Sequence, residues 1–275
     1  MQETYDVIVI GAGATGLACA HTLHRRGVEV LCLESGRAPG GIMTTQQEGG
    51  FLFEQGPNTI PASAPCFRRL TQEAGLLDRL TVSNPAASLR LVYRNGRLHP
   101  LPTGPLEFAR SKLLSVGGKL RLMSEPFRPM SKVGLFDAEP SLQEFLVDRL
   151  GQEAAQVLGG AFVRGVYAAE LNELGARSAF PRVFNLANDA GGIVRGVLKA
   201  RKAAKSQPGT PLPGPSLPPG SLLSFPRGLG ELPLVLARGL GQRLQLGRGA
   251  TEIERGAGGW VVTVDDGARF RAESK

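Results

Sequence analysis

Apolar residues open the chain in two short runs, separated by a stretch with helical spacing. Residues 5–10 (YDVIVI) and 28–33 (VEVLCL) are mainly aliphatic, as expected for strands buried on both faces. Between them, residues 14–26 place apolar side chains at helical intervals, and Gly27 follows where a helix commonly ends. This order predicts a βαβ unit in which two parallel strands are joined by a right-handed crossover.

The rest of the chain changes character twice. Residues 51–54 are a strand candidate, and residues 90–94 and 97–101 flank Asn95-Gly96, a dipeptide favoured in type I′ hairpin turns. From residue 105 to about 205 the pattern is mostly helical, as in segments 141–151 and 183–205. A helix near 229–240 and three strands complete the predicted elements, the strands at 243–246, 260–264 and 268–271.

Residues 206–220 contain six prolines and three glycines, which is too many for regular structure. We interpret this segment as a mobile surface loop or linker. A docking site for a proline-recognising module is a weaker alternative.

A glycine-rich motif lies at the junction of the first predicted strand and helix. It reads G-x-G-x-x-G and consists of Gly11, Ala12, Gly13, Ala14, Thr15 and Gly16. Gly11 permits a tight turn, Gly13 lets a pyrophosphate approach the backbone, and Gly16 lets helix and strand pack closely. The phosphates would then meet the amides at the helix N-terminus. A merely structural glycine turn is the alternative, and the strand–helix context argues against it.

An acidic residue ends the second strand. Glu34 follows Gly16 by 18 residues, where a carboxylate can accept hydrogen bonds from both ribose hydroxyls of an adenosine. The same carboxylate would repel a 2′-phosphate, which argues against NADP. Ser35, the pair Gly40-Gly41, Phe51 and the segment 54–57 come next, and an NAD dehydrogenase does not need this continuation. The first 60 residues therefore resemble the superfamily of FAD-dependent amine oxidases and desaturases.

Later segments narrow the resemblance to the protoporphyrinogen and coproporphyrinogen oxidases. They are ESGRAPGGIMTTQQEGGFLFEQGPNT (34–59), NPAASLRLVYRNGRLHPLPTG (84–104), KLRLMSEPF (119–127), FVRGVYAAELNELGARSAFPRVFNL (162–186) and SFPRGLGELPLVLARGLG (224–241). They occur in the family's order and extend over nearly the whole chain. Amine oxidases and carotenoid desaturases do not share these later motifs.

The resemblance implies a flavoenzyme that removes six electrons from a porphyrinogen. Hydride would pass from a meso carbon to N5 of FAD, and oxygen would reoxidise the flavin with release of hydrogen peroxide. Since the cofactor carries this chemistry, we assign no catalytic side chain and no metal ligand. The only histidines are His21, His24 and His99, and no nucleophile–base arrangement stands out.

The resemblance also implies cofactor and substrate contacts, position by position. The FAD contacts are Gly11, Ala12, Gly13, Ala14, Thr15, Gly16, Glu34, Ser35, Gly41, Ile42, Gly56, Pro57, Asn58, Thr59 and, at the adenine, Ala250. Arg90 matches an arginine that pairs with a propionate of the substrate. A solvated strand arginine is the alternative for Arg90, and the family context favours the substrate role.

The formal net charge of +8 favours anionic partners without choosing among them. The helical middle of the chain resembles the family's membrane-associated module. Its segment 107–133 has two acidic residues and six basic ones, namely Arg110, Lys112, Lys119, Arg121, Arg128 and Lys132. This face could rest on anionic lipid beside the apolar Phe108, Leu113, Leu114 and Phe127. A solvated charged face explains the same residues equally well, and nucleic acid explains them poorly.

Location and assembly are less constrained. No basic leader precedes the first apolar run, and no unbroken apolar stretch reaches about 18 residues. Cys19, Cys32 and Cys66 lack C-x-x-C spacing and are typical of buried free thiols in a reducing compartment. We expect a cytoplasmic protein, with peripheral attachment to the inner face of the membrane and a homodimer left open.

The expected fold is α/β: an FAD-binding, Rossmann-like domain with an inserted, mainly helical module and part of a β-rich substrate domain. Residues 1–83 form the FAD-binding βαβ part, 84–205 the substrate- and membrane-associated module, 206–220 the loop, and 221–275 the return to the FAD-binding domain.

Three departures from the family pattern stand out. Ile42-Met43 replaces an arginine that many relatives place after the glycine pair, and Ala169-Glu170 replaces glycine–aspartate. Family members also continue well beyond residue 270, so we expect a C-terminally incomplete chain. Such a chain would leave sheet edges and apolar surface unpaired.

Three hypotheses stay open. The chain is a porphyrinogen oxidase in shortened form; or it is a non-catalytic fragment or subunit that binds flavin or porphyrin; or it is another amine oxidase-like or desaturase-like flavoenzyme. The sequence leaves the choice between coproporphyrinogen III and protoporphyrinogen IX open.

Overall fold

The structure, a computed structural model, describes residues 4–84, 89–102, 104–128, 139–206, 212–218, 220–256 and 258–273. The chain divides into two compact units. We call Met1–Pro85 with Pro211–Lys275 the terminal unit, and Ala86–Thr210 the middle unit. The two units meet at 85/86 and 210/211, whereas the sequence placed the boundaries of the middle module at 83/84 and 205/206.

The terminal unit combines several small sheets with three helices. Its strands are β1 (Thr4–Tyr5), β2 (Val7–Ile10), β3 (Val30–Glu34), β4 (Thr45–Glu48), β5 (Phe51–Glu54), β6 (Ile60–Pro61), β7 (Thr81–Val82), β10 (Leu222–Ser224), β11 (Leu244–Leu246), β12 (Ala250–Gly256), β13 (Gly259–Val264) and β14 (Arg269–Glu273). Its helices are α1 (Ala14–Arg25), α2 (Pro65–Glu73) and α11 (Glu231–Leu240), with 3-10 turns η1 (Leu77–Arg79) and η5 (Gly241–Arg243).

The predicted βαβ unit is confirmed. Strands β2 and β3 pair in parallel, and α1 connects them. Strand β11 joins β3 on its other side, also in parallel, which gives the sheet order β11-β3-β2. The segment after residue 220 thus returns to the sheet of the βαβ unit. Helix α1 ends at Arg25, and Gly27 follows with a φ of 78°, a conformation that favours glycine.

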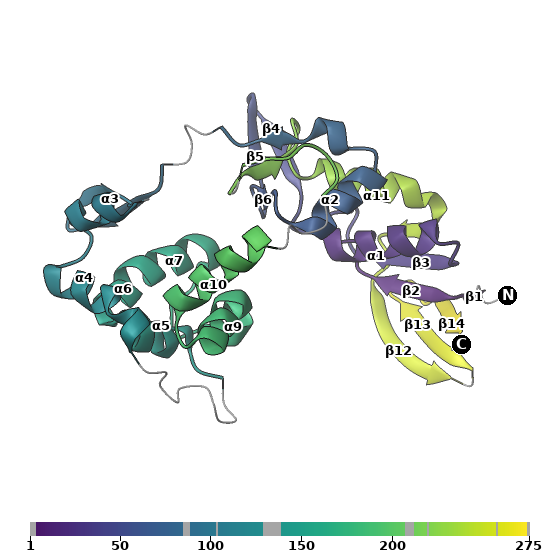
Figure 1. Ribbon diagram of the computed structural model, residues 1–275. Coiled ribbons are helices and arrows are strands. Elements are labelled where there is room, and N and C mark those ends of the chain that lie inside the picture. Colours follow the sequence, from purple (N-terminus) through teal and green to yellow (C-terminus); the bar gives the residue numbers. More distant parts are fainter. Residues whose placement is uncertain are drawn as a thin grey trace. The chain divides into compact units, whose positions relative to one another are not determined.

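Two layers cover this sheet on opposite faces (Figure 1). On one face, Leu17 of α1 and Leu236 of α11 pack with Val30 of β3. On the other, Val262 and Phe270 of the meander β12–β14 pack with β3 and partly bury Ile8 of β2. The apolar runs of the sequence therefore form strands between two apolar layers.

The three cysteines differ from the expectation of buried thiols. Cys32 is buried, and burial raises the pKa of its thiol to about 11, with Glu34 and Cys19 adding to the rise. Cys19 and Cys66 are exposed instead, because α1 and α2 turn them away from the core. The prediction of burial is thus wrong for two of the three.

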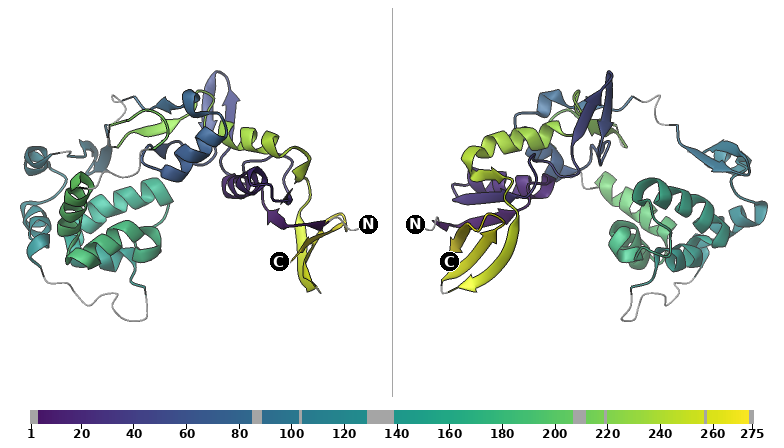
Figure 2. Two further views of the ribbon diagram at one scale, coloured as in Figure 1. Left: turned by 45° about the vertical axis from the view of Figure 1, so that its right-hand side comes forward. Right: turned by 180° about the vertical axis from the view of Figure 1, so that it is seen from behind.

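The middle unit is mainly helical, as predicted (Figure 2). Its elements are the hairpin β8 (Leu91–Arg94) and β9 (Arg97–Pro100), the helices α3 (Pro105–Arg110), α4 (Val116–Met123), α5 (Leu142–Leu150), α6 (Gln152–Ala154), α7 (Gly160–Tyr167), α8 (Ala176–Ala179), α9 (Pro181–Ala190) and α10 (Ile193–Ser206), a 3-10 turn η3 (Glu125–Phe127) and a π-turn η4 (Ala155–Gly159).

Glycines mark two boundaries in this unit. Asn95 and Gly96 have φ values of 51° and 76°, so the predicted type I′ hairpin turn is confirmed. The helical segment expected at 183–205 is divided, because Gly191 adopts a φ of 74° and ends α9 before α10 begins.

Two charged side chains of the KLRLMSEPF segment cap neighbouring helices. The guanidinium of Arg121 donates to the carbonyls of Asp148 (2.6 Å) and Arg149 (3.0 Å), at the C-terminal end of α5. The fully buried carboxylate of Glu125 accepts from the amides of Ile193 (2.6 Å) and Val194 (3.2 Å), at the start of α10. Each charge opposes the partial charge at its helix end.

In the Pro/Gly-rich segment 206–220, residue 206 ends α10, and the other described residues, 212–218 and 220, form neither helix nor strand. The carbonyl of Pro215 accepts a hydrogen bond from the buried Arg68 at 2.8 Å, and Leu217 packs against the core of the terminal unit. This part is therefore packed onto α2 rather than being a free linker.

Candidate functional site

The glycine motif forms a turn that directly follows β2. Gly11 has a φ of +97°, which side chains rarely adopt, and its amide donates to the carbonyl of Leu33 at 2.7 Å. A Cβ on Gly16 would overlap the carbonyl oxygen of Gly11. The first and third glycines are therefore required by the backbone, the first by its conformation and the third by close packing.

The middle glycine is different. Gly13 precedes α1 with ordinary extended angles, and a Cβ placed on it would meet no protein atom within 4 Å. No side chain caps α1, and its first turn has no acidic residue, so its amide groups are open to a ligand. Nothing in the protein packing thus explains a glycine at position 13, whereas a ligand close to the backbone does.

The glycine pair lies against this turn. The amide of Gly40 donates to the carbonyl of Ala12 at 2.8 Å, and a Cβ on Gly41 would lie 3.3 Å from the Cα of Gly13. Gly40 and Gly41 have φ values of 116° and 57°. At Gly41 the close approach to the turn leaves little room for a side chain, and the positive φ values of both residues favour glycine.

Glu34 holds the turn through its side chain. Its carboxylate accepts hydrogen bonds from the amides of Ala12 (2.6 Å) and Gly36 (2.7 Å) and from the hydroxyl of Ser35 (3.3 Å). Partial burial would raise the pKa of Glu34, but these hydrogen bonds outweigh it and hold the pKa below its ordinary value. Glu34 is therefore a carboxylate, with acceptor capacity left for further donors.

The segment before β12 lies against the end of β3 and the residues that follow it, from Glu34 to Gly36. The amide of Arg248 donates to the carbonyl of Glu34 at 2.8 Å, and that of Gly247 to the carbonyl of Gly36 at 2.9 Å. A Cβ on Gly249 would lie 3.2 Å from the Cβ of Ser35. Ala250, the next residue, begins β12, so the structure brings this predicted contact beside Ser35.

The predicted contacts after the glycine pair also lie together. A Cβ on Gly56 would lie 2.5 Å from the carbonyl oxygen of Ile42, so the two segments touch at Gly56. The side chain of Ile42 is 75% exposed. Pro57 is half-buried, and Asn58 and Thr59 are exposed.

Two acidic residues that the sequence reading did not single out hold the β4–β5 hairpin and the turn before α11. The carboxylate of Glu54 accepts from the amide of Leu229 (2.8 Å) and the hydroxyl of Thr45 (2.7 Å). Glu231, nearly buried, accepts from the amide of Arg227 and forms an ion pair with Arg79 at 2.6 Å. The only sequence signal was an acidic residue next to a glycine turn in each case.

Arg90 lies in the middle unit, immediately before β8, and is exposed. Its carbonyl accepts from the amide of Leu101 at 2.8 Å. The hairpin beside it is anchored by Arg94, whose guanidinium lies 2.9 Å from Glu153. Hydrogen bonds from the hydroxyl and amide of Ser115 and from Arg94 lower the pKa of Glu153 to about 2. The substrate role of Arg90 stays a prediction.

The described part of the chain contains neither a metal-binding cluster nor a membrane-spanning helix. Its His, Cys, Asp and Glu side chains form no group of three or more that could hold a metal ion. None of its helices combines the length and apolar character needed to cross a membrane.

Comparisons with known proteins extend over nearly the whole chain. The model of a family described as flavin containing amine oxidoreductase matches residues 14–274. Protoporphyrinogen oxidase 1 of Arabidopsis thaliana is 31% identical over 96% of this chain and 50% of its own length. Coproporphyrinogen III oxidase of Bacillus subtilis is 28% identical over 73% of this chain and 45% of its own. The chain thus spans about half the length of the curated relatives it matches.

Solved structures share the fold. A crystal structure from Exiguobacterium sp. 255-15, provisionally described as a protoporphyrinogen oxidase, has a TM-score of 0.72 at 24% identity and covers 99% of this chain and 58% of its own. Cyclohexylamine oxidase from Brevibacterium oxydans IH-35A has a TM-score of 0.64 at 19% identity and covers 98% of this chain and 56% of its own.

Proposed function

We propose that this chain binds FAD and oxidises a porphyrinogen to a porphyrin. The proposal starts from the finding that the chain belongs to the family of flavin-containing amine oxidoreductases. The observation that carries the proposal is the match over 96% of the chain to a protoporphyrinogen oxidase, combined with a glycine turn built for a dinucleotide. The substrate we propose is coproporphyrinogen III or protoporphyrinogen IX. The relatives' names support this choice, since they include protoporphyrinogen oxidase and coproporphyrinogen III oxidase.

The residues at the turn fit FAD. Gly13 leaves open space where a pyrophosphate would approach the backbone, and the uncapped start of α1 would donate amide hydrogen bonds to it. Glu34, which stays ionised because of its lowered pKa, would accept hydrogen bonds from the ribose hydroxyls of the adenosine. Ala250, beside Ser35, would meet the adenine.

Bound FAD would accept hydride at N5, and oxygen would reoxidise it with release of hydrogen peroxide. The chain's own residues bind and orient. Glu34 holds the amide of Ala12 and so keeps the turn in the shape that receives phosphate. Gly41 lets its segment lie against Gly13 of the turn, and Gly56 lets the segment that follows lie against Ile42.

Arg90 would pair with a propionate of the substrate. Its guanidinium is exposed, so the carboxylate can reach it from solvent. As an exposed ion pair, the contact of Arg90 with the propionate would contribute about 0.2–1 kcal/mol. Arg94 lies at the end of β8 next to the hairpin turn. Its ion pair with Glu153 therefore fastens the hairpin formed by β8 and β9.

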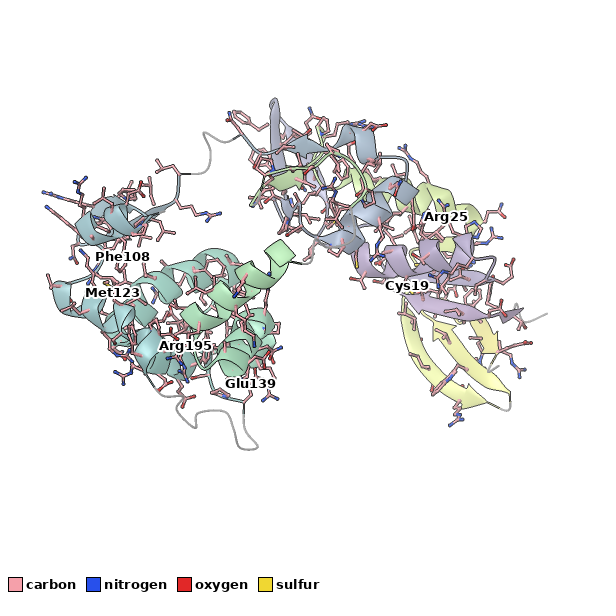
Figure 3. All side chains as sticks on the ribbon, viewed as in Figure 1. Cys19, Arg25, Phe108, Met123, Glu139 and Arg195 are labelled. Atoms are coloured by element: carbon pink, nitrogen blue, oxygen red, sulfur yellow. The ribbon has the colours of Figure 1, made fainter. Side chains whose placement is uncertain are left out.

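The middle unit also offers a surface for an anionic membrane. Leu113 and Leu114, which the sequence placed on this face, are buried, so they are not available to lipid. Leu120, Met123 and Phe127 are instead between 63% and 84% exposed, on α4 and η3, and Figure 3 shows Met123 at the surface of this unit. Arg110, Lys112 and Arg128 are exposed nearby in the sequence. Apolar side chains beside basic ones are the pattern of a peripheral contact. We propose a cytoplasmic protein, and the exposed apolar and basic side chains support peripheral attachment to the inner face of the membrane as an alternative to a fully solvated protein.

The basic set is smaller than the sequence suggested. Arg121 donates to carbonyls of α5, and the ammonium of Lys119 donates to the carbonyl of Ala109 at 2.8 Å. Both are therefore engaged within the unit. Lys132 lies outside the described residues. Neither a lipid contact nor a solvated surface therefore accounts for Arg121 and Lys119, because both bind backbone carbonyls at helix ends.

The test of the proposed reaction uses the purified chain with FAD. We expect porphyrin fluorescence to appear after coproporphyrinogen III or protoporphyrinogen IX is added in air, faster than in the enzyme-free autoxidation control, with hydrogen peroxide formed alongside. An FAD-loaded chain that yields no porphyrin above the control from either substrate would support the alternative of a non-catalytic flavin-binding chain.

A further inference from the structure

Arg68 of α2 carries a buried positive charge that no acidic side chain of the described residues balances. The residue is 3% exposed, and none of the ion pairs among the described residues includes it. Its Nη2 donates to the carbonyl of Pro215 at 2.8 Å, and its enclosed Nε has no hydrogen-bond partner. Because an uncompensated buried charge is costly, charges in such places are normally paired.

The segment that covers Arg68 supplies no countercharge. Residues 206–220 contain neither aspartate nor glutamate. Within this segment Gly214 has a φ of 83°, and a Cβ placed on it would lie 2.9 Å from Nη2 of Arg68. The backbone of the segment therefore lies directly against the guanidinium and leaves its charge unbalanced.

A cavity of about 410 Å3 opens beside Arg68, between the start of α2 and the segment that covers it. Arg68 is the single charged residue among the described residues that line this cavity. The lining also includes the hydroxyl-bearing Ser63 and Ser216 and the apolar Leu212 and Leu217. One cation thus lies in a lining that is otherwise neutral and largely apolar.

The position of the cavity relative to α2 favours the same sign of ligand. Ala62 and Ser63, which line the cavity, come immediately before the first turn of this nine-residue helix. Among the described residues no side chain caps this end, and the first turn contains no acidic residue. The partial positive charge of the helix end therefore adds to the charge of Arg68.

We propose that this cavity binds a small organic anion, in which a carboxylate neutralises Arg68 and an apolar body lies against Leu212 and Leu217. A carboxylate matches the planar guanidinium in shape and carries the single negative charge that one arginine balances. A phosphate dianion would keep an unbalanced charge in the same place. The lining includes none of the residues 11–16 of the glycine turn, so this ligand is distinct from FAD, and the inference does not depend on the proposed reaction.

The test measures binding of hexanoate to the full 275-residue chain by isothermal titration calorimetry, with and without FAD. Three further probes separate the contributions: hexan-1-ol has the apolar body without the charge, acetate has the charge with almost no body, and inorganic phosphate is the other oxyanion. We expect hexanoate to bind saturably and each of the other three to bind at least tenfold more weakly.

Each of three results would overturn the proposal. They are the absence of saturable hexanoate binding, equal or tighter binding of any of the other probes, and loss of hexanoate binding when FAD is added. The last result would place the anion in the cofactor site.

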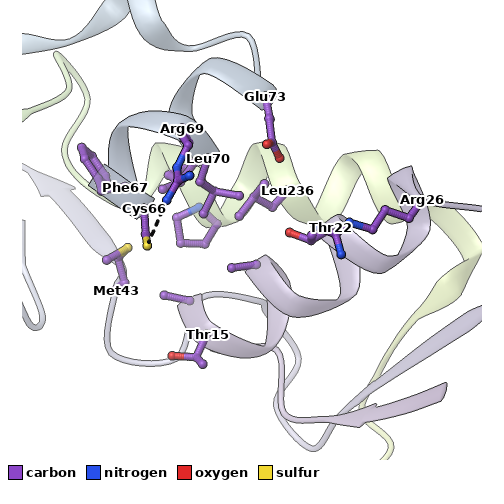
Figure 4. A pocket seen from close by; sticks show the side chains of 14 residues that line it. Thr15, Thr22, Arg26, Met43, Cys66, Phe67, Arg69, Leu70, Glu73 and Leu236 are labelled. Atoms are coloured by element: carbon purple, nitrogen blue, oxygen red, sulfur yellow. Dashed lines mark hydrogen bonds between the residues drawn. The ribbon is translucent and has the colours of Figure 1, made fainter. Parts of the chain in front are cut away.

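Two neighbouring arginines give a matched pair of variants. Arg69, the next residue, is exposed and lines a different cavity, where its guanidinium lies 3.9 Å from Sγ of Cys66 (Figure 4). Arg68→Met and Arg69→Met remove the same charge from the same helix. We expect Arg68→Met to bind hexanoate at least tenfold more weakly and Arg69→Met to bind it like the wild type. Equal binding by the two variants would contradict the role of Arg68.

A measurement on the unsubstituted chain locates the ligand without relying on any variant. When hexanoate is added, the backbone amide resonances of Ser63, Gly214 and Leu217 should shift in nuclear magnetic resonance spectra. Those of the meander β12–β14, none of whose residues lines the cavity, should stay in place. Shifts that leave Ser63, Gly214 and Leu217 unaffected would exclude this cavity as the site.

Discussion

The carboxylate of Glu34 accepts a hydrogen bond from the backbone amide of Ala12 at 2.6 Å, which joins the end of β3 to the glycine turn after β2. The amide of Gly36 donates to the other carboxylate oxygen at 2.7 Å. A single side chain thus fixes the turn and presents a negative charge beside it. This relationship links the βαβ fold to the proposed cofactor.

Replacing Glu34 with Gln should weaken FAD binding. The amide side chain would face the amide of Ala12 or Gly36 with a donor, and the turn would lose a charge-assisted hydrogen bond of ~1.5–3 kcal/mol, or roughly 10- to 100-fold in affinity. FAD titration by fluorescence measures the change. Glu48→Gln, at an exposed position of β4, is the control and should bind normally. Equal affinity in both variants would contradict the role of Glu34.

Replacing Gly16 with Ala should destabilise the terminal unit itself. The added Cβ would overlap the carbonyl oxygen of Gly11, so α1 and β2 must separate. Overpacking of this kind costs about 1–3 kcal/mol. Chemical denaturation followed by circular dichroism measures the loss, with Gly104→Ala, where the Cβ would meet open space, as the matched control. An unchanged midpoint for Gly16→Ala would refute the close packing.

His21 should make stability depend on pH. Its ring is buried between α1 and α11, and within the described residues neither ring nitrogen has a hydrogen-bond partner. Burial, followed by the charge of Arg25, lowers the pKa of His21 below 6.5. The unfolded chain therefore binds a proton first as pH falls through 6.5, so stability is full above that pH and declines below it.

Urea denaturation at pH 7.5 and pH 5.5 tests this sign. The wild type should lose more stability on acidification than His21→Leu, which has no proton to bind. His24→Leu, three residues away on the same helix, is the control and should behave like the wild type. A larger acid sensitivity in His21→Leu would reverse the argument.

Replacing Glu125 with Ala should loosen α10. Two amides at the start of the helix would lose their acceptor in a buried place, at about 1–3 kcal/mol each. Hydrogen exchange of the amides of Ile193 and Val194 should rise in Glu125→Ala and rise less in Glu125→Gln, which keeps one acceptor oxygen. Exchange that is unchanged in both variants would show that Glu125 is not the cap.

Features of this fold that depend on neighbouring residues could be predicted from the sequence. Contacts between residues far apart in the sequence could not. The βαβ unit and the hairpin at Asn95-Gly96 follow from short apolar runs and from glycines, whose requirements lie within a few residues. The roles of Arg121 and Glu125 depend on helix ends 27 and 68 residues away. A basic residue at position 121 therefore looked like part of a charged surface.

The same limit applies to the candidate site. The glycine turn, the glycine pair and Glu34 are adjacent in space, as their order along the chain suggests. Glu54 could not be singled out, because its partner Leu229 lies 175 residues further along.

The most direct test of the FAD site compares Gly13→Ala with the wild type in a titration with FAD. Gly13 has extended backbone angles, and a Cβ added there would meet open space. Alanine should therefore leave the free energy of unfolding unchanged or raise it by about 0.4–1 kcal/mol. The wild type should bind FAD saturably, and Gly13→Ala should bind at least tenfold more weakly at undiminished stability. A wild type that does not bind FAD, or a Gly13→Ala variant that binds it equally well, would contradict the site.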